Sequence, residues 1–278
     1  MNAYADLTTL KSTSFLSLTG TGDDLYLRLL LEIASRAIGN YCDRFFHTWE
    51  GARYYDGAAN RLFLDDILSI ATLKTDDNMD GTFENSYTVN RDYEMYPLNK
   101  YPKEIIELST RSTRAYSSFS DGNKKAIEIT GVFGYGDGQS AAPYLSSGAV
   151  VNTGGITNSA LTHALATGKG ALLAIGQTVR IGTEQLYITG ISTDTLTFER
   201  GMNGTVAVAH TAADVIYICL YPEPIKLACL IQAMRWWKRK DSAFQDMVGS
   251  AETGTLIYSK PLDADVKMLL SSYKRVHG

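Results

Sequence analysis

Residues 23–46 read DDLYLRLLLEIASRAIGNYCDRFF, and this stretch carries the strongest secondary-structure signal of the chain. Two rows of apolar residues recur at a spacing of four. The first row is Leu25, Leu29, Ile33, Ala37 and Tyr41, and the second is Leu30, Ala34, Ile38 and Cys42. Such a pattern is typical of an amphipathic helix with a broad apolar face. We therefore predict a helix here that packs against a core and has no chemistry of its own.

The composition is that of an ordinary globular protein, with 45% hydrophobic and 20% charged residues among 278. The formal net charge of −4 argues against a global positive field that would draw the chain to nucleic acid or to an anionic membrane. The sequence shows neither the features of a signal peptide nor an apolar run long enough to span a bilayer. Its three scattered cysteines predict buried, reduced thiols in a cytosolic setting.

Two further helices are expected near the C-terminus, one entered through Pro224 and one opened by Pro261. Upstream, β-branched and aromatic runs with turn signals between them predict a small antiparallel sheet. Its strands are expected at 49–55, 61–64, 67–75, 87–96, 105–108 and 126–133. Residues 1–20 are predicted to form a flexible arm with one helical turn.

A change in composition separates these parts. Residues 134–156 are rich in Gly, Ser and Ala, which predicts a linker. Short strands punctuated by glycine follow, which favours a small β barrel or sandwich. They are expected at 178–181, 185–188, 195–198 and 214–218.

We therefore predict an α+β fold. Its core comprises three main helices and a small antiparallel β part, formed by residues 1–136 and 219–278. An inserted all-β domain, barrel-like or sandwich-like, is expected at 137–218.

The stretch Asp76-Asp77-Asn78-Met79-Asp80-Gly81 is the closest approach to a metal-binding motif. An EF-hand loop needs a bidentate Glu at its twelfth position, where this chain has Tyr87, and its flanks should be helical. Asp-Gly between strands is also a hairpin signal. The interpretation is a turn, with calcium binding as the alternative.

No recognisable catalytic arrangement occurs in the sequence. The four histidines are far apart, and adjacent Asp65 and Asp66 would face opposite sides of a strand, so we interpret them as solvated or capping. We predict that the chain is not an enzyme, with no catalytic residue, cofactor or metal.

The run 235–240, RWWKRK, mixes cations with aromatic residues. Such pairs can grip nucleic acid and stack bases. The favoured interpretation is a helix end whose cations complement the helix dipole while the tryptophans pack inward, because Trp237 continues the apolar stripe. A protein interface is the second alternative.

Several stretches have a familiar order along the chain. The first is DD at 23–24, which precedes a predicted helix that ends in YCDRFF at 41–46. The second is LFLDDILSI at 62–70 with the hairpin after it, and the third is AIEITGVFGY at 126–135. The fourth is PEPIKLA at 222–228, which precedes RWWKR at 235–239. In this order they resemble the head-tail connector (adaptor) proteins of long-tailed bacteriophages. The chain departs from them by inserting about eighty residues between Tyr135 and Pro222. Within that insert, 199–205 (ERGMNGT) with His210 resembles small β modules of phage structural proteins.

The resemblance implies a core that is a helical bundle of three main helices with a small antiparallel β part. It also implies a virion structural protein that forms a dodecameric ring beneath the portal and extends the DNA channel. The expected partners are the portal protein, a stopper or tail-completion protein, and other copies of the chain. Packaged DNA would pass through the lumen without sequence-specific contact, and no membrane is involved. The protein would be made in the host bacterial cytoplasm and reside in the neck of the virion.

By position, the resemblance assigns the C-terminal part of the chain to the portal or subunit interface. The candidate residues are Arg235, Trp236, Lys238, Arg239, Leu256, Ile257, Tyr258, Leu269 and Tyr273.

A different class of function is an accessory virion protein whose β module recognises host-surface carbohydrate. It requires a shallow site lined by aromatic side chains. The aromatic residues of the insert are chiefly Tyr144, Tyr187, Phe198 and Tyr217, and the last three alternate with aliphatic residues as core positions do.

Overall fold

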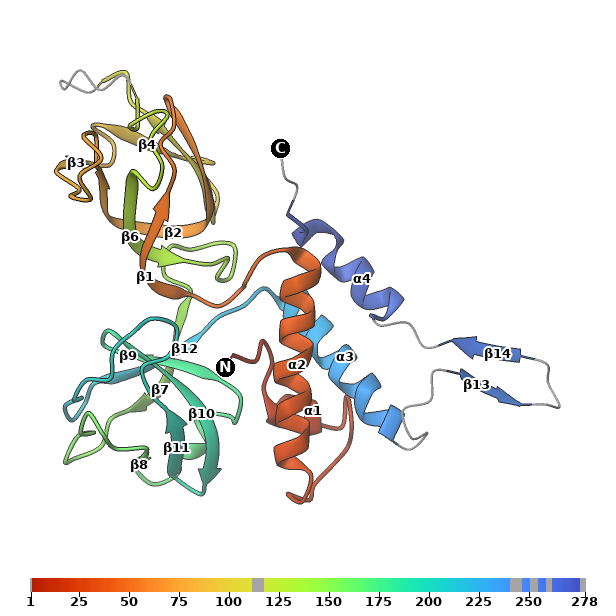
Figure 1. Ribbon diagram of the computed structural model, residues 1–278. Coiled ribbons are helices and arrows are strands. Elements are labelled where there is room, and N and C mark those ends of the chain that lie inside the picture. The colour runs from red at the N-terminus through yellow and green to blue at the C-terminus, as the bar shows by residue number, and fades with distance from the viewer. Residues whose placement is uncertain (1, 112–117, 241–246, 251–254, 259–261, 276–278) are drawn as a thin grey trace. The chain divides into compact units, whose positions relative to one another are not determined.

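The computed structural model describes residues 2–111, 118–240, 247–250, 255–258 and 262–275 (Figure 1). The chain divides into two units. The sheet unit comprises Arg44–Tyr144 with Asn203–Val206, and the helix–sheet unit comprises Met1–Asp43, Leu145–Met202 and Ala207–Gly278.

The sheet unit is built on an antiparallel sheet of six strands. These are β1 (Trp49–Tyr55), β2 (Arg61–Thr75), β3 (Asn85–Tyr87), β4 (Tyr93–Tyr96), β5 (Lys103–Leu108) and β6 (Ile127–Phe133). The strands pair in the order β1-β6-β2-β5-β4, and β3 pairs with β2. Ile127, Ile129 and Phe133 of β6 are buried, so alternate residues of this strand face the core.

Strand β2 joins two strands that the sequence pattern separates. Asp65 and Asp66 lie at a register irregularity between Phe63 and Ile67. Asp66 is only 2% exposed and lies 3.3 Å from the Arg44 guanidinium, whereas Asp65 pairs with Arg53. The interpretation as solvated or capping is therefore wrong for Asp66, which is buried beside Arg44, whereas the side chain of Asp65 is 40% exposed and remains solvated.

The metal-like stretch is a turn, as predicted. Asp76 accepts hydrogen bonds from the backbone N–H groups of Met79 (2.7 Å) and Gly81 (2.8 Å), and Asp80 accepts one from Thr82 (2.8 Å). The carboxylates that a cation would need are thus used to close the loop.

The helix–sheet unit contains the second six-stranded antiparallel sheet and the helices. Its strands pair in the order β7-β12-β9-β10-β11-β8. They are β7 (Tyr144–Val150), β8 (Thr162–Ala164), β9 (Thr178–Ile181), β10 (Glu184–Ser192), β11 (Thr195–Glu199) and β12 (Val215–Cys219). The helices are α1 (Leu7–Lys11), α2 (Asp24–Cys42), α3 (Glu223–Arg239) and α4 (Ala264–Leu270), with short 3₁₀ turns η1 (Gly170–Leu172) and η3 (Ser271–Tyr273). A hairpin of β13 (Met247–Ser250) and β14 (Thr255–Tyr258) lies between α3 and α4 in sequence.

The predicted helical bundle with a small β part is wrong. The described part of the chain is mostly β, with two antiparallel six-stranded sheets and the four helices α1 to α4. The three expected helices are present, but the β content was underestimated. The supposed linker contains β7, in which Ser146, Ser147 and Gly148 break the apolar alternation that signals a strand.

The second sheet occupies nearly the stretch expected as an insert at 137–218. It shares a unit with the helices, whereas the sequence analysis grouped the helices with the first sheet. The predicted domain boundaries stay a prediction.

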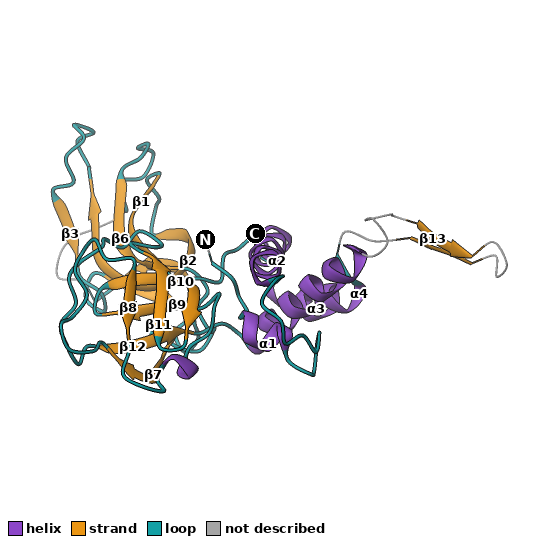
Figure 2. Cartoon of the chain, turned by 90° about the horizontal axis from the view of Figure 1, so that it is seen from below, coloured by secondary structure: helices purple, strands orange, loops and turns teal. Residues whose placement is uncertain are grey.

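The long helices α2 and α3 pack against each other, and α3 lies between α2 and α4 (Figure 2). Ser35 of α2 and Cys229 of α3 approach within 3.3 Å at their interface. All three cysteines are buried thiols outside any disulfide, as predicted. On another side, α2 meets the second sheet, where the Tyr187 hydroxyl donates to Glu32 at 2.9 Å.

The N-terminal residues are packed rather than forming a flexible arm. Ala3, Tyr4, Leu7 and Leu10 are buried, and the backbone N–H of Leu7 donates to the carbonyl of Ile175 at 2.9 Å. The expectation of a flexible arm is therefore wrong for this segment, because its apolar residues are used in the core.

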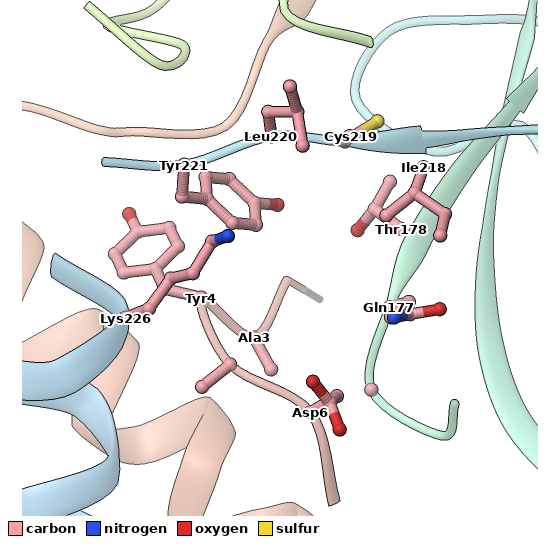
Figure 3. Close-up of a pocket in the computed structure, with 12 residues that line it drawn as sticks. Ala3, Tyr4, Asp6, Gln177, Thr178, Ile218, Cys219, Leu220, Tyr221 and Lys226 are labelled. Carbon is pink, nitrogen blue, oxygen red and sulfur yellow. The ribbon is translucent and has the colours of Figure 1, made fainter. Parts of the chain in front are cut away.

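A small cavity lies where the N-terminal segment meets the second sheet (Figure 3). Tyr4 and Tyr221 border it with ring centroids 5.1 Å apart, and Thr178 lines its sheet side. Its volume of about 80 Å³ suits a few water molecules. Sites for drug-sized ligands measure roughly 300–1,000 Å³, so the cavity is too small to hold a cofactor.

A buried charge cluster fixes the long loop after β11 to the second sheet. The Glu184 carboxylate accepts from Nε (2.9 Å) and Nη2 (2.6 Å) of Arg200, and His210 Nε2 lies 2.8 Å from it. The backbone N–H groups of Gly201 and Val208 also donate to it, at 3.0 and 3.1 Å. The side chains of Glu184, Arg200 and His210 are almost fully buried, so the cluster is a structural element that sets the loop conformation.

This cluster predicts acid-sensitive stability. Burial raises the pKa of Glu184, but hydrogen bonds from Arg200, Val208, Gly201 and His210 outweigh it and hold the pKa below its ordinary value of 4.5. The stabilising contribution is therefore complete above pH 4.5 and is lost as the pH falls through the lower folded-state pKa. The urea midpoint should fall more steeply on acidification for the wild type than for Glu184→Gln. Parallel pH profiles for the two proteins would contradict this assignment.

Candidate interaction site

The four candidate residues of the basic run lie in the last two turns of α3. Arg235 pairs with Asp263, the N-cap residue of α4. Lys238 is exposed, whereas Trp236 and Arg239 are half-buried. The pairing of Arg235 shows that part of this charge serves the chain's own packing, by joining the end of α3 to the start of α4.

Trp237 packs inward at the same helix end. Its ring lies 5.8 Å from that of Tyr26 in α2, and Lys240 lies 4.2 Å above it. Lys240 also lies 3.5 Å from Asp23, before the first turn of α2. These contacts support the interpretation of the run as a packed helix end, and they show that α2 and α3 run antiparallel.

The other candidate residues are spread over three elements. Leu256, Ile257 and Tyr258 belong to β14, where Leu256 pairs with Gly249 of β13. Leu269 lies in α4, and Tyr273 is half-buried in η3. The nine candidate residues therefore lie on four elements, α3, β14, α4 and η3.

Leu269 borders an apolar groove that the sequence analysis did not identify. The helix groove, as we call it, has a volume of about 580 Å³ and lies between α1, α3 and α4. Its lining residues are Ala5, Asp6, Thr9, Phe15, Glu223, Pro224, Lys226, Leu227, Leu230 and Leu269. Leu227 is 40% exposed at its surface, so the groove offers apolar side chains to a partner.

A second apolar surface lies on α2. Leu25, Leu29 and Ile33 are 73%, 46% and 44% exposed, and we call this row the α2 ridge. The sequence analysis placed these residues in the core, which is wrong. The buried side of α2 instead includes Leu27, Leu30, Leu31, Ala34, Ile38 and Cys42. Both sides of α2 are apolar, so periodicity alone does not tell which side α3 covers.

Two of the four aromatic residues considered for a carbohydrate site are buried. Tyr187 and Phe198 are buried in the helix–sheet unit, as their alternation predicted, and Tyr217 is exposed on β12. Tyr144 lies in the other unit. A shallow site built from the side chains of Tyr187 and Phe198 is therefore ruled out, because neither ring reaches the surface.

Among the residues that the structure describes, no group of three His, Cys, Asp or Glu side chains is placed to hold a metal ion. No helix in that part of the chain is long and apolar enough to cross a membrane. Comparison with known families and with curated proteins gave no match to this chain. What the described surfaces offer is apolar contact area for a macromolecular partner.

Proposed function

We propose that this chain is a head-tail connector (adaptor) subunit of a long-tailed bacteriophage. It forms a ring beneath the portal, extends the DNA channel and provides the docking surface for the stopper or tail. The role is structural, and the partners are the portal protein, a stopper or tail-completion protein, and neighbouring copies of the chain.

The observation that carries the proposal is the α2 ridge. Monomeric proteins rarely expose large contiguous apolar patches, and such patches usually mark sites of protein association. The ridge lies on the helix whose flanking sequences, DD at 23–24 and YCDRFF at 41–46, contribute to the resemblance. The helix that ends RWWKR is present as α3. The proposal is therefore supported by the helices and not by the overall fold, because the fold is rich in β-strands whereas the resemblance implies a helical bundle.

The proposal predicts specific binding at one vertex of the phage head. Purified protein mixed with DNA-filled, tailless heads should add a ring of density beneath the portal in electron micrographs. The matched control is the same head with its tail attached, in which the site is occupied and no density should be added. Binding spread over the whole capsid, or no added density at the portal vertex, would contradict the proposal.

A further inference from the structure

We propose that the α2 ridge of one copy packs into the helix groove of a second copy, which joins subunits head to tail. The inference rests on the proposed connector function and assigns the subunit contact of its ring. Four observations carry it: the ridge's shape, the groove's shape, the charges beside them and their places on different elements.

The ridge has the geometry that a second set of helices can accept. Leu25, Leu29 and Ile33 are spaced by four residues, so they form one continuous row over about 12 Å of helix. Rows of this spacing are the ridges that insert into the grooves of a facing helix. The row projects from a helix that is fixed by α3 on one side and by the second sheet, through Glu32, on another.

The helix groove is the concave counterpart. Its apolar lining includes Phe15 after α1, Leu227 and Leu230 of α3, and Leu269 of α4. A volume of about 580 Å³ gives room for several apolar side chains. Because helices α3 and α4 form two of its walls, a helix ridge is the element that fits it by ordinary helix packing.

Arg36, beside the ridge, is opposite in sign to the two carboxylates beside the groove. Arg36 is exposed on the same face of α2 as the ridge, three residues beyond Ile33. The rim of the groove carries Asp6 and the exposed Glu223, and Lys226 of the same chain pairs with one carboxylate oxygen of Glu223 at 2.7 Å, which leaves the other oxygen for a second cation. Arg36 of one copy can therefore pair with Glu223 of the next, which would set the direction of the ridge in the groove.

The ridge and the groove lie on different elements, so the contact is heterologous. Each copy uses its ridge on one neighbour and its groove on the other, and such contacts close into a ring when the rotation between copies permits. Pairing through one shared surface would instead stop at a dimer.

The test uses one variant for each surface, Leu29→Asp for the ridge and Leu227→Asp for the groove. Sedimentation should show concentration-dependent oligomers for the wild type and monomers for each variant alone. Each substitution should weaken association by about 100-fold or more, because it buries an unpaired carboxylate in the contact. An equimolar mixture should give a heterodimer and nothing larger, since one functional ridge and one functional groove remain.

Leu98→Asp is the matched control, because Leu98 is an exposed apolar residue of the sheet unit. It should oligomerise like the wild type, and circular dichroism should show that all three variants are folded. A wild type that stays monomeric at every concentration would overturn the inference. So would a Leu227→Asp protein that still dimerises, because its ridges would then pair with each other.

The contact and the connector role fail in different ways. If both Leu29→Asp and Leu227→Asp add as much density beneath the portal as the wild type, the ridge–groove contact is overturned and the connector role is retained. The expected mixing pattern in solution, without binding at the portal vertex, would retain the contact and reject the connector role.

Discussion

Replacing Glu184 with glutamine is expected to lower the free energy of unfolding by about 3–5 kcal/mol, the usual loss when one partner of a buried ion pair is removed. The substitution keeps the shape of the side chain but removes its charge. The guanidinium of Arg200, which is almost fully buried, would then lack its bidentate carboxylate. Urea unfolding followed by circular dichroism measures the loss.

The double variant Glu184→Gln with Arg200→Met is the control for this prediction. It removes the buried cation as well, so it should be more stable than Glu184→Gln alone. A loss below about 1 kcal/mol for the single variant would show that the cluster is not a major source of stability, since a net hydrogen bond contributes that much.

Replacing Leu31 with alanine is expected to cost about 2–5 kcal/mol, whereas Leu29→Ala should cost about 0.5 kcal/mol or less. Leu31 is fully buried, and Cys229 of α3 contacts its carbonyl oxygen, so truncation leaves a cavity beside the α2–α3 interface. Leu29 lies two residues earlier in the same helix, on the exposed ridge. Both variants make the same Leu-to-Ala change in the same helix, so the difference between them measures the effect of burial and not that of helix propensity.

Urea unfolding of the two alanine variants, at a protein concentration low enough for the chain to be monomeric, measures the difference. Equal losses would mean that the ridge is covered within a single chain, and the inferred contact between copies would lose its basis. A larger loss of unfolding free energy for Leu29→Ala than for Leu31→Ala would mean that the Leu29 side of α2, and not the Leu31 side, faces the core.

Local sequence signals predicted individual elements well. The strand predicted at 178–181 is β9 with the same bounds, and the strand at 49–55 is β1. Both carry β-branched or aromatic residues, and turn signals bound them. The sequence pattern predicted two strands, 61–64 and 67–75, in place of β2, because Asp65 and Asp66 interrupt the apolar residues. The structure shows that these two carboxylates pair with Arg53 and Arg44, which allows them to lie within one strand.

The candidate surfaces depend on packing that local patterns do not encode. In α2, the rows on either side of the helix are both apolar, and only the position of α3 decides which becomes the core. In the Glu184 cluster, Arg200 lies 16 positions and His210 lies 26 positions after Glu184 in the sequence. Neither spacing matches a helix or strand period, so periodicity does not predict the cluster. The resemblance of 199–205 with His210 to small β modules includes Arg200 and His210 but not Glu184.

The burial of every cysteine makes the native chain a suitable background for thiol labelling. Burial raises the pKa of Cys229 to about 11, so little reactive thiolate forms there at neutral pH. Cys42 and Cys219 are shielded from reagents as well. A cysteine introduced at Leu29 or Leu227 would thus carry a fluorophore selectively, and energy transfer between labelled copies would report in real time on how subunits associate.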